Sequence, residues 1–150
     1  MTRFRRVVRI NHDPDNLFEL VSGIEQYPEF IKWVQKMDVS PVEEDGVKSI
    51  KIGSARVGFA NFTETFSTQV VSDAETRHIK VSLEDGPLKH LENEWTFKPA
   101  ESGTDIEFFI DFEFKNFILR ALAAANFELA VNRIMAAFVA EADRRYGNKS

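Results

Sequence analysis

Glu64 is the carboxylate whose neighbours could give it a chemical role. It lies between Phe62 and Phe66 in the stretch GFANFTETF, and residues two apart on a strand share a face. The alternation therefore predicts a carboxylate on an apolar inward face, where a charge is costly unless it is paired or protonated. A carboxyl that keeps its proton could donate a hydrogen bond to a bound carbonyl or hydroxyl. Two alternatives stay open: a twist or bulge turns Glu64 outward, or an arginine such as Arg56 neutralises it.

The three histidines do not form a catalytic or metal-binding pattern. His12, His78 and His90 are far apart in the sequence, without the spacing of ligands on one helix, and we expect them at the surface. The chain has no Gly-x-Ser-x-Gly, no phosphate-binding glycine loop and no His-Glu-x-x-His motif. It also has no cysteine, which excludes disulfides and thiolate chemistry. We therefore expect no enzyme activity, no catalytic residue, no metal and no catalytic cofactor.

Length and charge narrow the class of protein further. A chain of 150 residues without repeats or linkers predicts a single domain over residues 1–150. A net charge of −5 makes nucleic acid an improbable partner, since phosphate binding normally needs a basic surplus. No apolar run approaches the ~20 residues of a membrane span, and the N-terminal segment lacks a signal-like apolar core. These features predict a cytoplasmic protein.

The N-terminal third predicts one strand and two short helices. Residues 3–10 alternate in the manner of a half-buried strand. Asp13 and Pro14 form a helix start, with Asp13 as N-cap and Pro14 in the first turn. A second short helix is expected over residues 26–33.

The rest of the chain predicts about six strands followed by one long helix. Turn residues recur at intervals between about residues 35 and 115, which is typical of an antiparallel meander. In the last strand one face is entirely apolar: Ile106, Phe108, Ile110, Phe112 and Phe114. The helix is expected over about 116–146, with one apolar stripe made of Phe127, Ala130, Val131, Ile134, Met135 and Phe138. A curved sheet around one long helix cannot close tightly, so we expect an internal apolar cavity.

Three segments give the chain a family resemblance: YPEFIKW after the first helix, DGPLKHLENEWTFKP in the sheet and FFIDFEFKNFILRAL at the last helix. With this element order, the chain resembles the coenzyme Q-binding proteins of the START-like superfamily of polyketide cyclases and lipid-transport proteins. The resemblance implies an α+β helix-grip fold, in which a curved antiparallel sheet of six or seven strands wraps around the long helix. It also implies that ubiquinone or a polyprenylated precursor is held in the cavity, for respiration or quinone biosynthesis.

The same resemblance leaves other functions open. A sister branch resembles a ribosome-associated toxin that blocks subunit joining, and an aromatase or cyclase on this scaffold is a lesser alternative. A quinone carrier would be cytoplasmic or peripheral at the inner membrane, with transient contact to the membrane surface.

The expected ligand site follows from strand alternation and the helix stripe. An aromatic wall suits a quinone ring, and an apolar channel suits an isoprenoid tail. We expect the head group near Glu64 and Trp95. The predicted cavity residues are Phe62, Glu64, Phe66, Trp95, Phe97, Phe108, Ile110, Phe112, Phe114, Phe127, Val131 and Met135. The alternative is that these aromatic residues are ordinary core.

The predicted rim of the cavity has two parts. Tyr27, Pro28, Phe30 and Trp33 form either an exposed gate or a lid packed on the sheet edge. Gly86, Pro87 and Leu88 form a tight turn at the cavity mouth, where Leu88 replaces the aromatic residue seen in many relatives.

A basic cluster lies in the first strand. Arg3, Arg5, Arg6 and Arg9 could contact anionic lipid or ribosomal RNA. Alternatively they form a solvated edge that discourages aggregation.

Overall fold

The computed structural model describes residues 2–59 and 61–147. It confirms the predicted α+β helix-grip fold, with two short helices after the first strand and one long helix at the end. The elements are β1 (Thr2–Ile10), α1 (Pro14–Ser22), a 3-10 turn (Ile24–Gln26), α2 (Tyr27–Phe30), β2 (Val34–Glu44), β3 (Lys48–Phe59), β4 (Phe62–Asp73), β5 (His78–Asp85), β6 (Leu88–Pro99), β7 (Thr104–Phe114) and α3 (Phe117–Tyr146).

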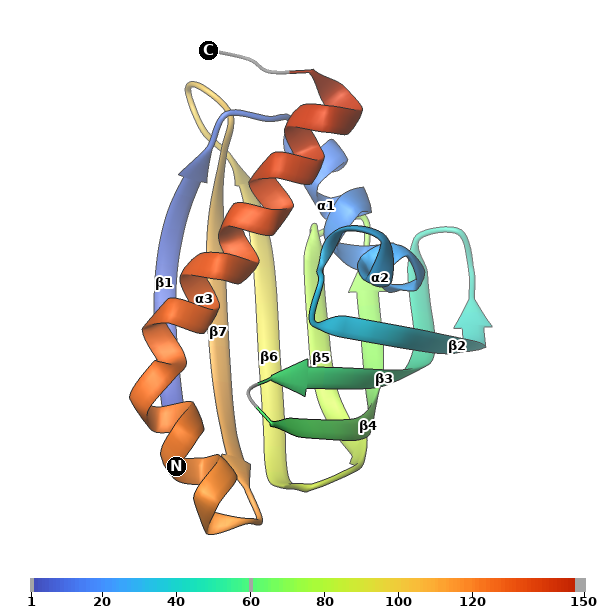
Figure 1. Ribbon diagram of the computed structural model, residues 1–150. Coiled ribbons are helices and arrows are strands. Elements are labelled where there is room, and N and C mark those ends of the chain that lie inside the picture. The colour runs from blue at the N-terminus through green and yellow to red at the C-terminus, as the bar shows by residue number, and fades with distance from the viewer. Residues whose placement is uncertain (1, 60, 148–150) are drawn as a thin grey trace.

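The seven strands form one antiparallel sheet in the order β1-β7-β6-β5-β4-β3-β2. Strands β2 to β7 follow one another as hairpins, whereas β1 pairs with the last strand, so that Thr2 lies opposite Phe112. The sheet bends strongly, and β2 and β3 run across the direction of β1, β7 and β6 (Figure 1). Helix α3 lies over β1 and β7 and ends beside α1 (Figure 1).

Local sequence signals explain where α1 begins and where α2 ends. The Asp13 carboxylate accepts a hydrogen bond from Asp15 N at 2.9 Å, and Pro14 opens the helix, as predicted. Helix α2 is shorter than expected. It ends at Phe30 because the backbone of Ile31 is extended, at φ −107° and ψ 100°, which turns the chain into β2.

The predicted faces of β1 and β7 are confirmed. The alternating apolar residues of both strands lie on the inner face toward α3. Arg3, Arg5, Arg9 and the acids of β7 lie on the other face, whereas Arg6 shares the inner face and donates a hydrogen bond to Asn132 on α3. The predicted helix stripe is correct at Val131, Met135 and Phe138, which are buried. Ala130 is exposed, because a helix that rests on a curved sheet buries about one residue per turn at this point rather than two neighbours.

Candidate functional site

The inner face of the sheet is solidly packed around Trp95. The Trp95 ring lies 4.8 Å from Phe108 and 5.5 Å from Phe138, between ring centroids, and it stacks on Phe97 at 6.3 Å. Phe97, Phe108, Val131 and Met135 are all buried in the same cluster. This end of the predicted site is therefore core, as the alternative proposed. We call it the closed end.

The opposite end of the inner face is incompletely covered. Phe62, Phe66, Phe114 and Phe127 are each half-buried, although Phe112, two residues before Phe114 on β7, is buried. Ile110, in the middle of β7, is also half-buried. Large aromatic side chains that keep part of their surface exposed on a concave face can bury that surface against an apolar ligand, which contributes favourable binding free energy. We call this region the open end.

Glu64 lies at the open end, on the face that alternation predicted. It is half-buried between Phe62 and Phe66, so the outward alternative is wrong. Arg56 does not neutralise it, because Arg56 is exposed and lies opposite Thr65 on the other face of the sheet. Glu64 forms no ion pair with any residue in the described ranges. The carboxylate therefore keeps its hydrogen-bonding capacity for water or a ligand.

Glu64 and Trp95 do not meet, contrary to the sequence expectation. Trp95 pairs with Ile79, which pairs with Ser72 on β4. Glu64 precedes Ser72 by eight residues on that strand, which is on the order of 26 Å at the usual rise. The last β4–β5 pair is Ser67 with Asp85, so Glu64 lies beyond the end of β5. A head group near Glu64 is therefore remote from the Trp95 ring.

The turn between β5 and β6 borders the open end. Gly86 has a φ of 146°, and a Cβ added there would lie 2.5 Å from Phe66 Cβ, so only glycine fits this close approach. The Lys115 N–H donates a hydrogen bond of 2.8 Å to the carbonyl of Pro87. This bond ties the turn to the start of α3, and Leu88 is buried opposite Phe114.

The short helices correspond to the lid alternative rather than to an exposed gate. The Tyr27 hydroxyl donates a hydrogen bond to the carbonyl of Val21, and burial raises the pKa of Tyr27. The rings of Tyr27 and Phe30 lie 5.5 and 5.6 Å from the Phe138 ring. Trp33 packs against the same core, and Pro28 is half-buried beside them.

Hollows at the surface of the described residues include one beside α3 and one beside His12. The larger, of about 480 Å³, lies between the start of β1 and the first half of α3. Its lining includes Arg3, Phe4, Phe127 and Leu129, so Phe127 is the one predicted cavity residue that it contains. The smaller, of about 290 Å³, lies beside His12 and Gly103.

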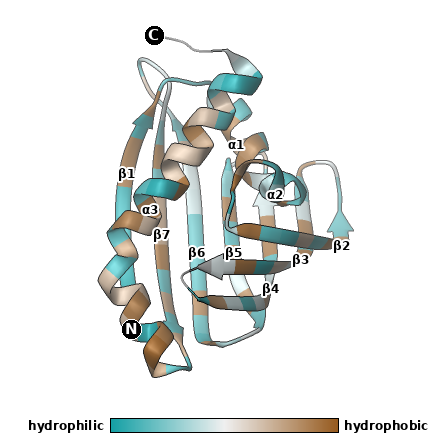
Figure 2. Cartoon of the chain, viewed as in Figure 1, coloured by the Kyte–Doolittle hydropathy of each residue, from teal (hydrophilic) through white to brown (hydrophobic). Residues whose placement is uncertain are grey.

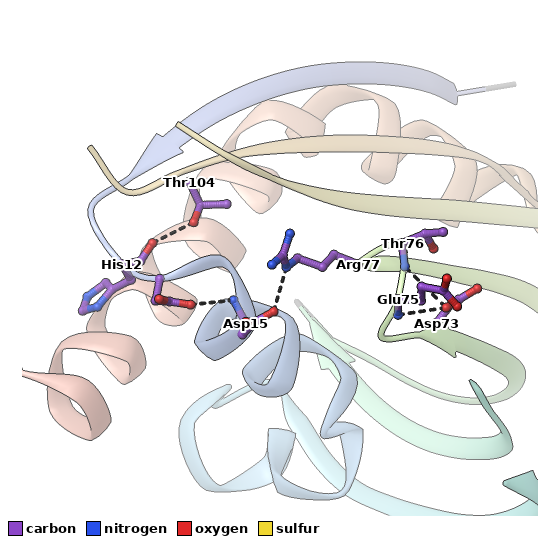
Figure 3. A network of polar contacts seen from close by, with 8 residues as sticks. His12, Asp15, Asp73, Glu75, Thr76, Arg77 and Thr104 are labelled. Carbon is purple, nitrogen blue, oxygen red and sulfur yellow. Dashed lines mark hydrogen bonds and ion pairs between the residues drawn. The ribbon is translucent and has the colours of Figure 1, made fainter. Parts of the chain in front are cut away.

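His12 is buried, which contradicts the expected surface position. It is 2% exposed; Nε2 lies 2.7 Å from the Asp143 carboxylate on α3, and its carbonyl accepts a hydrogen bond from Thr104 Oγ1. Figure 3 shows this loop beside the Asp15–Arg77 ion pair, which joins α1 to the β4–β5 turn. The contact between His12 and Asp143 thus links α3 to the β1–α1 loop. His78 and His90 pair with Glu94 and Asp111, half-buried on the sheet.

Two polar arrangements at the closed end escaped the sequence analysis. Asn93 faces inward, donates to the carbonyl of Phe109 at 2.8 Å and accepts from Trp95 Nε1 at 2.7 Å. Its position in the alternation of β6 was a usable signal. Glu141 is buried on α3, where hydrogen bonds from Arg144 and Arg145 lower its pKa from 4.5 to about 2.

The basic cluster of β1 is largely engaged within the protein. Arg9 pairs with Asp105, and Arg6 donates to Asn132 on α3 at 2.6 Å. Arg3 and Arg5 stack on the Phe109 ring, at 5.6 and 4.8 Å. Their side chains remain exposed, so a binding surface here would rest on these two. Within residues 2–59 and 61–147, no three acidic or histidine side chains gather as a metal site.

Several known proteins resemble this chain over most of its length. Ribosome association toxin RatA of Rickettsia prowazekii is 26% identical over 92% of this chain and 94% of the toxin. Coenzyme Q-binding protein COQ10 of Drosophila melanogaster is 29% identical over 94% of this chain, which spans 58% of that protein's length.

Solved structures agree on the fold. The 18 kDa protein CC1736 of Caulobacter crescentus is 38% identical, with a TM-score of 0.84 over 99% of this chain and 100% of the other. The Zhui aromatase/cyclase of Streptomyces sp. R1128 has a TM-score of 0.80 at 19% identity, over 97% of this chain and 95% of the enzyme. The second similarity concerns the fold alone.

A family model covers most of the chain. The model described as polyketide cyclase / dehydrase and lipid transport matches residues 10–139, which include β2 to β7, the short helices and most of α3. The chain therefore belongs to the polyketide cyclase/dehydrase and lipid transport family.

Proposed function

We propose that this protein is a non-enzymatic carrier that holds ubiquinone or a polyprenylated quinone precursor at the open end of its sheet. The observation that carries the proposal is a half-buried aromatic face, which surrounds a carboxylate without an ion-pair partner among the described residues. The aromatic residues would cover the ring and the start of the tail, and Glu64 would accept a hydrogen bond from a head-group hydroxyl or, in its protonated form, donate one to a carbonyl. The relatives named for coenzyme Q binding support the choice of ligand.

The closed end supplies the rigid part of this mechanism. Its rings are packed, so the ligand would not displace the core but would extend the apolar layer beyond Phe112. We propose that the carrier works in the cytoplasm and at the surface of the inner membrane. There it would take up quinone for respiration or quinone biosynthesis.

The first test is organic extraction and native mass spectrometry of protein purified from its own host. We expect a stoichiometric quinone or polyprenyl lipid. Phe114→Ser should reduce the bound lipid about tenfold, because it removes an inner-face ring worth about 1.5 kcal/mol or more. Phe109→Ser is the matched control, since Phe109 is also half-buried on β7 but lies on the other face. Protein free of lipid, or equal losses in both variants, would contradict the carrier.

The role of Glu64 needs its own pair of variants. Glu64→Gln keeps hydrogen-bonding groups and should change the affinity for a short-tail ubiquinone by less than threefold. Glu64→Leu should lower it about tenfold, because a protonated Glu64 carboxyl can donate a hydrogen bond to a quinone carbonyl and leucine cannot. Titration with the short-tail quinone measures both. Equal affinities for the two variants would show that Glu64 does not contact the ligand. Turnover of a polyketide that depends on Glu64 would favour an enzyme instead.

The second candidate is a ribosome-binding translation inhibitor. It is favoured by the toxins that match over nearly their whole length. In this case Arg3→Glu together with Arg5→Glu should abolish co-sedimentation with ribosomal subunits. Arg5→Glu alone should weaken it and leave lipid content unchanged, because Arg5 stacks on Phe109, which points away from the inner face. Protein that carries lipid and never sediments with subunits would exclude it.

A further inference from the structure

The first turns of α3 expose more apolar surface than a solvent-facing helix normally does. Phe117 is 72% exposed, Ile118 48% and Leu129 49%. Between them the exposed positions are mostly alanine, and Glu128 is the one acid in the first twenty-four residues of the helix. Figure 2 shows the first turn of α3 in the colour of hydrophobic residues. Contiguous apolar surface of this kind usually marks an interaction site.

The position of α3 decides how it could meet a membrane. By length and composition it is the one helix in the described ranges that could cross a bilayer, which alone is weak support, and 17% of its most apolar 18-residue stretch is buried. Its other side is held in the core through Leu119, Val131 and Met135. The helix is also fastened at its C-terminal end by Asp143 to His12. A helix held in this way lies along a membrane surface rather than across it.

The charges beside the exposed apolar residues fit an anionic surface. Lys115 is exposed directly before the helix. Arg3, 3.9 Å from the Asp111 carboxylate, is exposed at the edge of the larger hollow, where Glu128 is the one acid of the lining among the described residues. The nearest acid before the helix, Glu113, is engaged by Lys89 at 3.5 Å and Arg120 at 3.9 Å. Basic residues beside an apolar helix face are attracted to anionic phospholipid headgroups, each by about 1 kcal/mol.

The larger hollow opens on the same side. Its lining combines the apolar side chains of Phe4, Ala124, Ala125, Phe127 and Leu129 with those of Thr2, Arg3 and Glu128. The Phe127 ring lies 5.1 Å from Phe4 and 5.6 Å from Phe112, so one ring separates the hollow from the inner face of the sheet. An apolar tail that entered the hollow would therefore reach the open end by displacing a single aromatic side chain.

We propose that the first four turns of α3 dock on an anionic phospholipid membrane, with the hollow between β1 and α3 open to the acyl chains. This inference rests on the proposed function, because the membrane would be the source or destination of the carried lipid. It places the membrane contact at the start of α3, not at the short helices after β1.

Vesicle flotation tests the docking surface. The full chain should float with vesicles of phosphatidylcholine and phosphatidylglycerol at 7:3, and less with phosphatidylcholine alone. Phe117→Glu combined with Ile118→Glu should lower the partition coefficient at least tenfold. The helix should remain folded, since acids in a first helical turn are favourable. Val42→Glu is the matched control: Val42 is 60% exposed on β2, and its change should alter binding less than twofold.

Three results would overturn the docking surface. The first is wild-type protein that does not float, and the second is a double variant that floats as well as wild type. The third is a wild-type protein that does not bind vesicles but forms a dimer by light scattering, with the dimer lost in the double variant. Affinity for the soluble short-tail quinone separates the two proposals. If the double variant keeps its affinity for the quinone but wild-type protein does not bind vesicles, the carrier function is supported and the docking surface is excluded. If wild-type protein binds vesicles but no quinone, the docking surface is supported and the carrier function is excluded.

Discussion

The two ends of the inner face are built from the same residue types and differ in what covers them. At the closed end α1, α2 and the second half of α3 converge on Trp95, Phe97 and Phe138, and every ring has neighbours on several sides. At the open end the first half of α3 packs on Phe112 through Phe127, and Phe62, Phe66 and Phe114 remain partly exposed. An aromatic stripe therefore does not identify a ligand site by itself. The number of elements that cover it distinguishes core from site.

The largest expected effect is a difference in stability between the ends. Phe97→Ala should lower the free energy of unfolding by about 3–5 kcal/mol, because it empties a fully buried position. Phe66→Ala should cost about 1 kcal/mol, since the side chain is already half-exposed. Urea denaturation followed by circular dichroism measures both. Equal losses would mean that the open end is core in solution.

A smaller effect is expected at the turn that supports the open end. Gly86→Ala should destabilise the protein by about 1–3 kcal/mol, because alanine disfavours this φ and its Cβ would press on Phe66. Gly46 also has a positive φ, of 91°, but no atom lies within 4 Å of an added Cβ, so Gly46→Ala reports a backbone cost without a steric clash. Thermal melts of the pair compare them. A Gly86 variant no less stable than the Gly46 variant would show that Phe66 is free to move.

The smallest effect concerns pH and belongs to the closed end. Glu141 has its pKa lowered to about 2 by its arginine partners, so its contribution to stability is complete above about pH 4.5 and is lost as the pH falls from 4.5 toward 2. Glu141→Gln should cost on the order of 1 kcal/mol at pH 7 and flatten the stability curve in that acid range. Glu128→Gln, exposed on the same helix, should leave the curve unchanged. A wild-type slope retained in Glu141→Gln would contradict the assignment.

The fold follows from the sequence because its signals are local. The alternation of β7, the Asp13–Pro14 helix start and the long apolar stripe of α3 each depend on neighbouring residues. The strand alternation and the helix stripe each follow a single period, and all three signals agree with the structure except at Ala130 of the stripe, which is exposed. The inward position of Glu64 is local in the same sense, because its strand has no irregularity against β3.

The site follows less well because it depends on contacts between distant segments. His12 is buried by Asp143, 131 residues later, and Tyr27 is enclosed by Phe138. Alternation places Glu64 and Trp95 on one face but does not give their separation, which the strand register determines. Exposure at the start of α3 depends on where the helix leaves the sheet, and no periodicity in the sequence reports that.

The pairing of β1 with β7 constrains the order in which the chain can fold. Strands β2 to β7 can form hairpin by hairpin as they emerge during synthesis, since each pairs with the strand before it. Strand β1 is made before the other strands, yet its residue Thr2 pairs with Phe112 on β7. The apolar face of β1 can therefore be buried only after most of the chain has been made. Closing so long a loop is entropically costly and slows folding. A newly made chain therefore carries β1, with one largely apolar face, unpaired until β7 has left the ribosome.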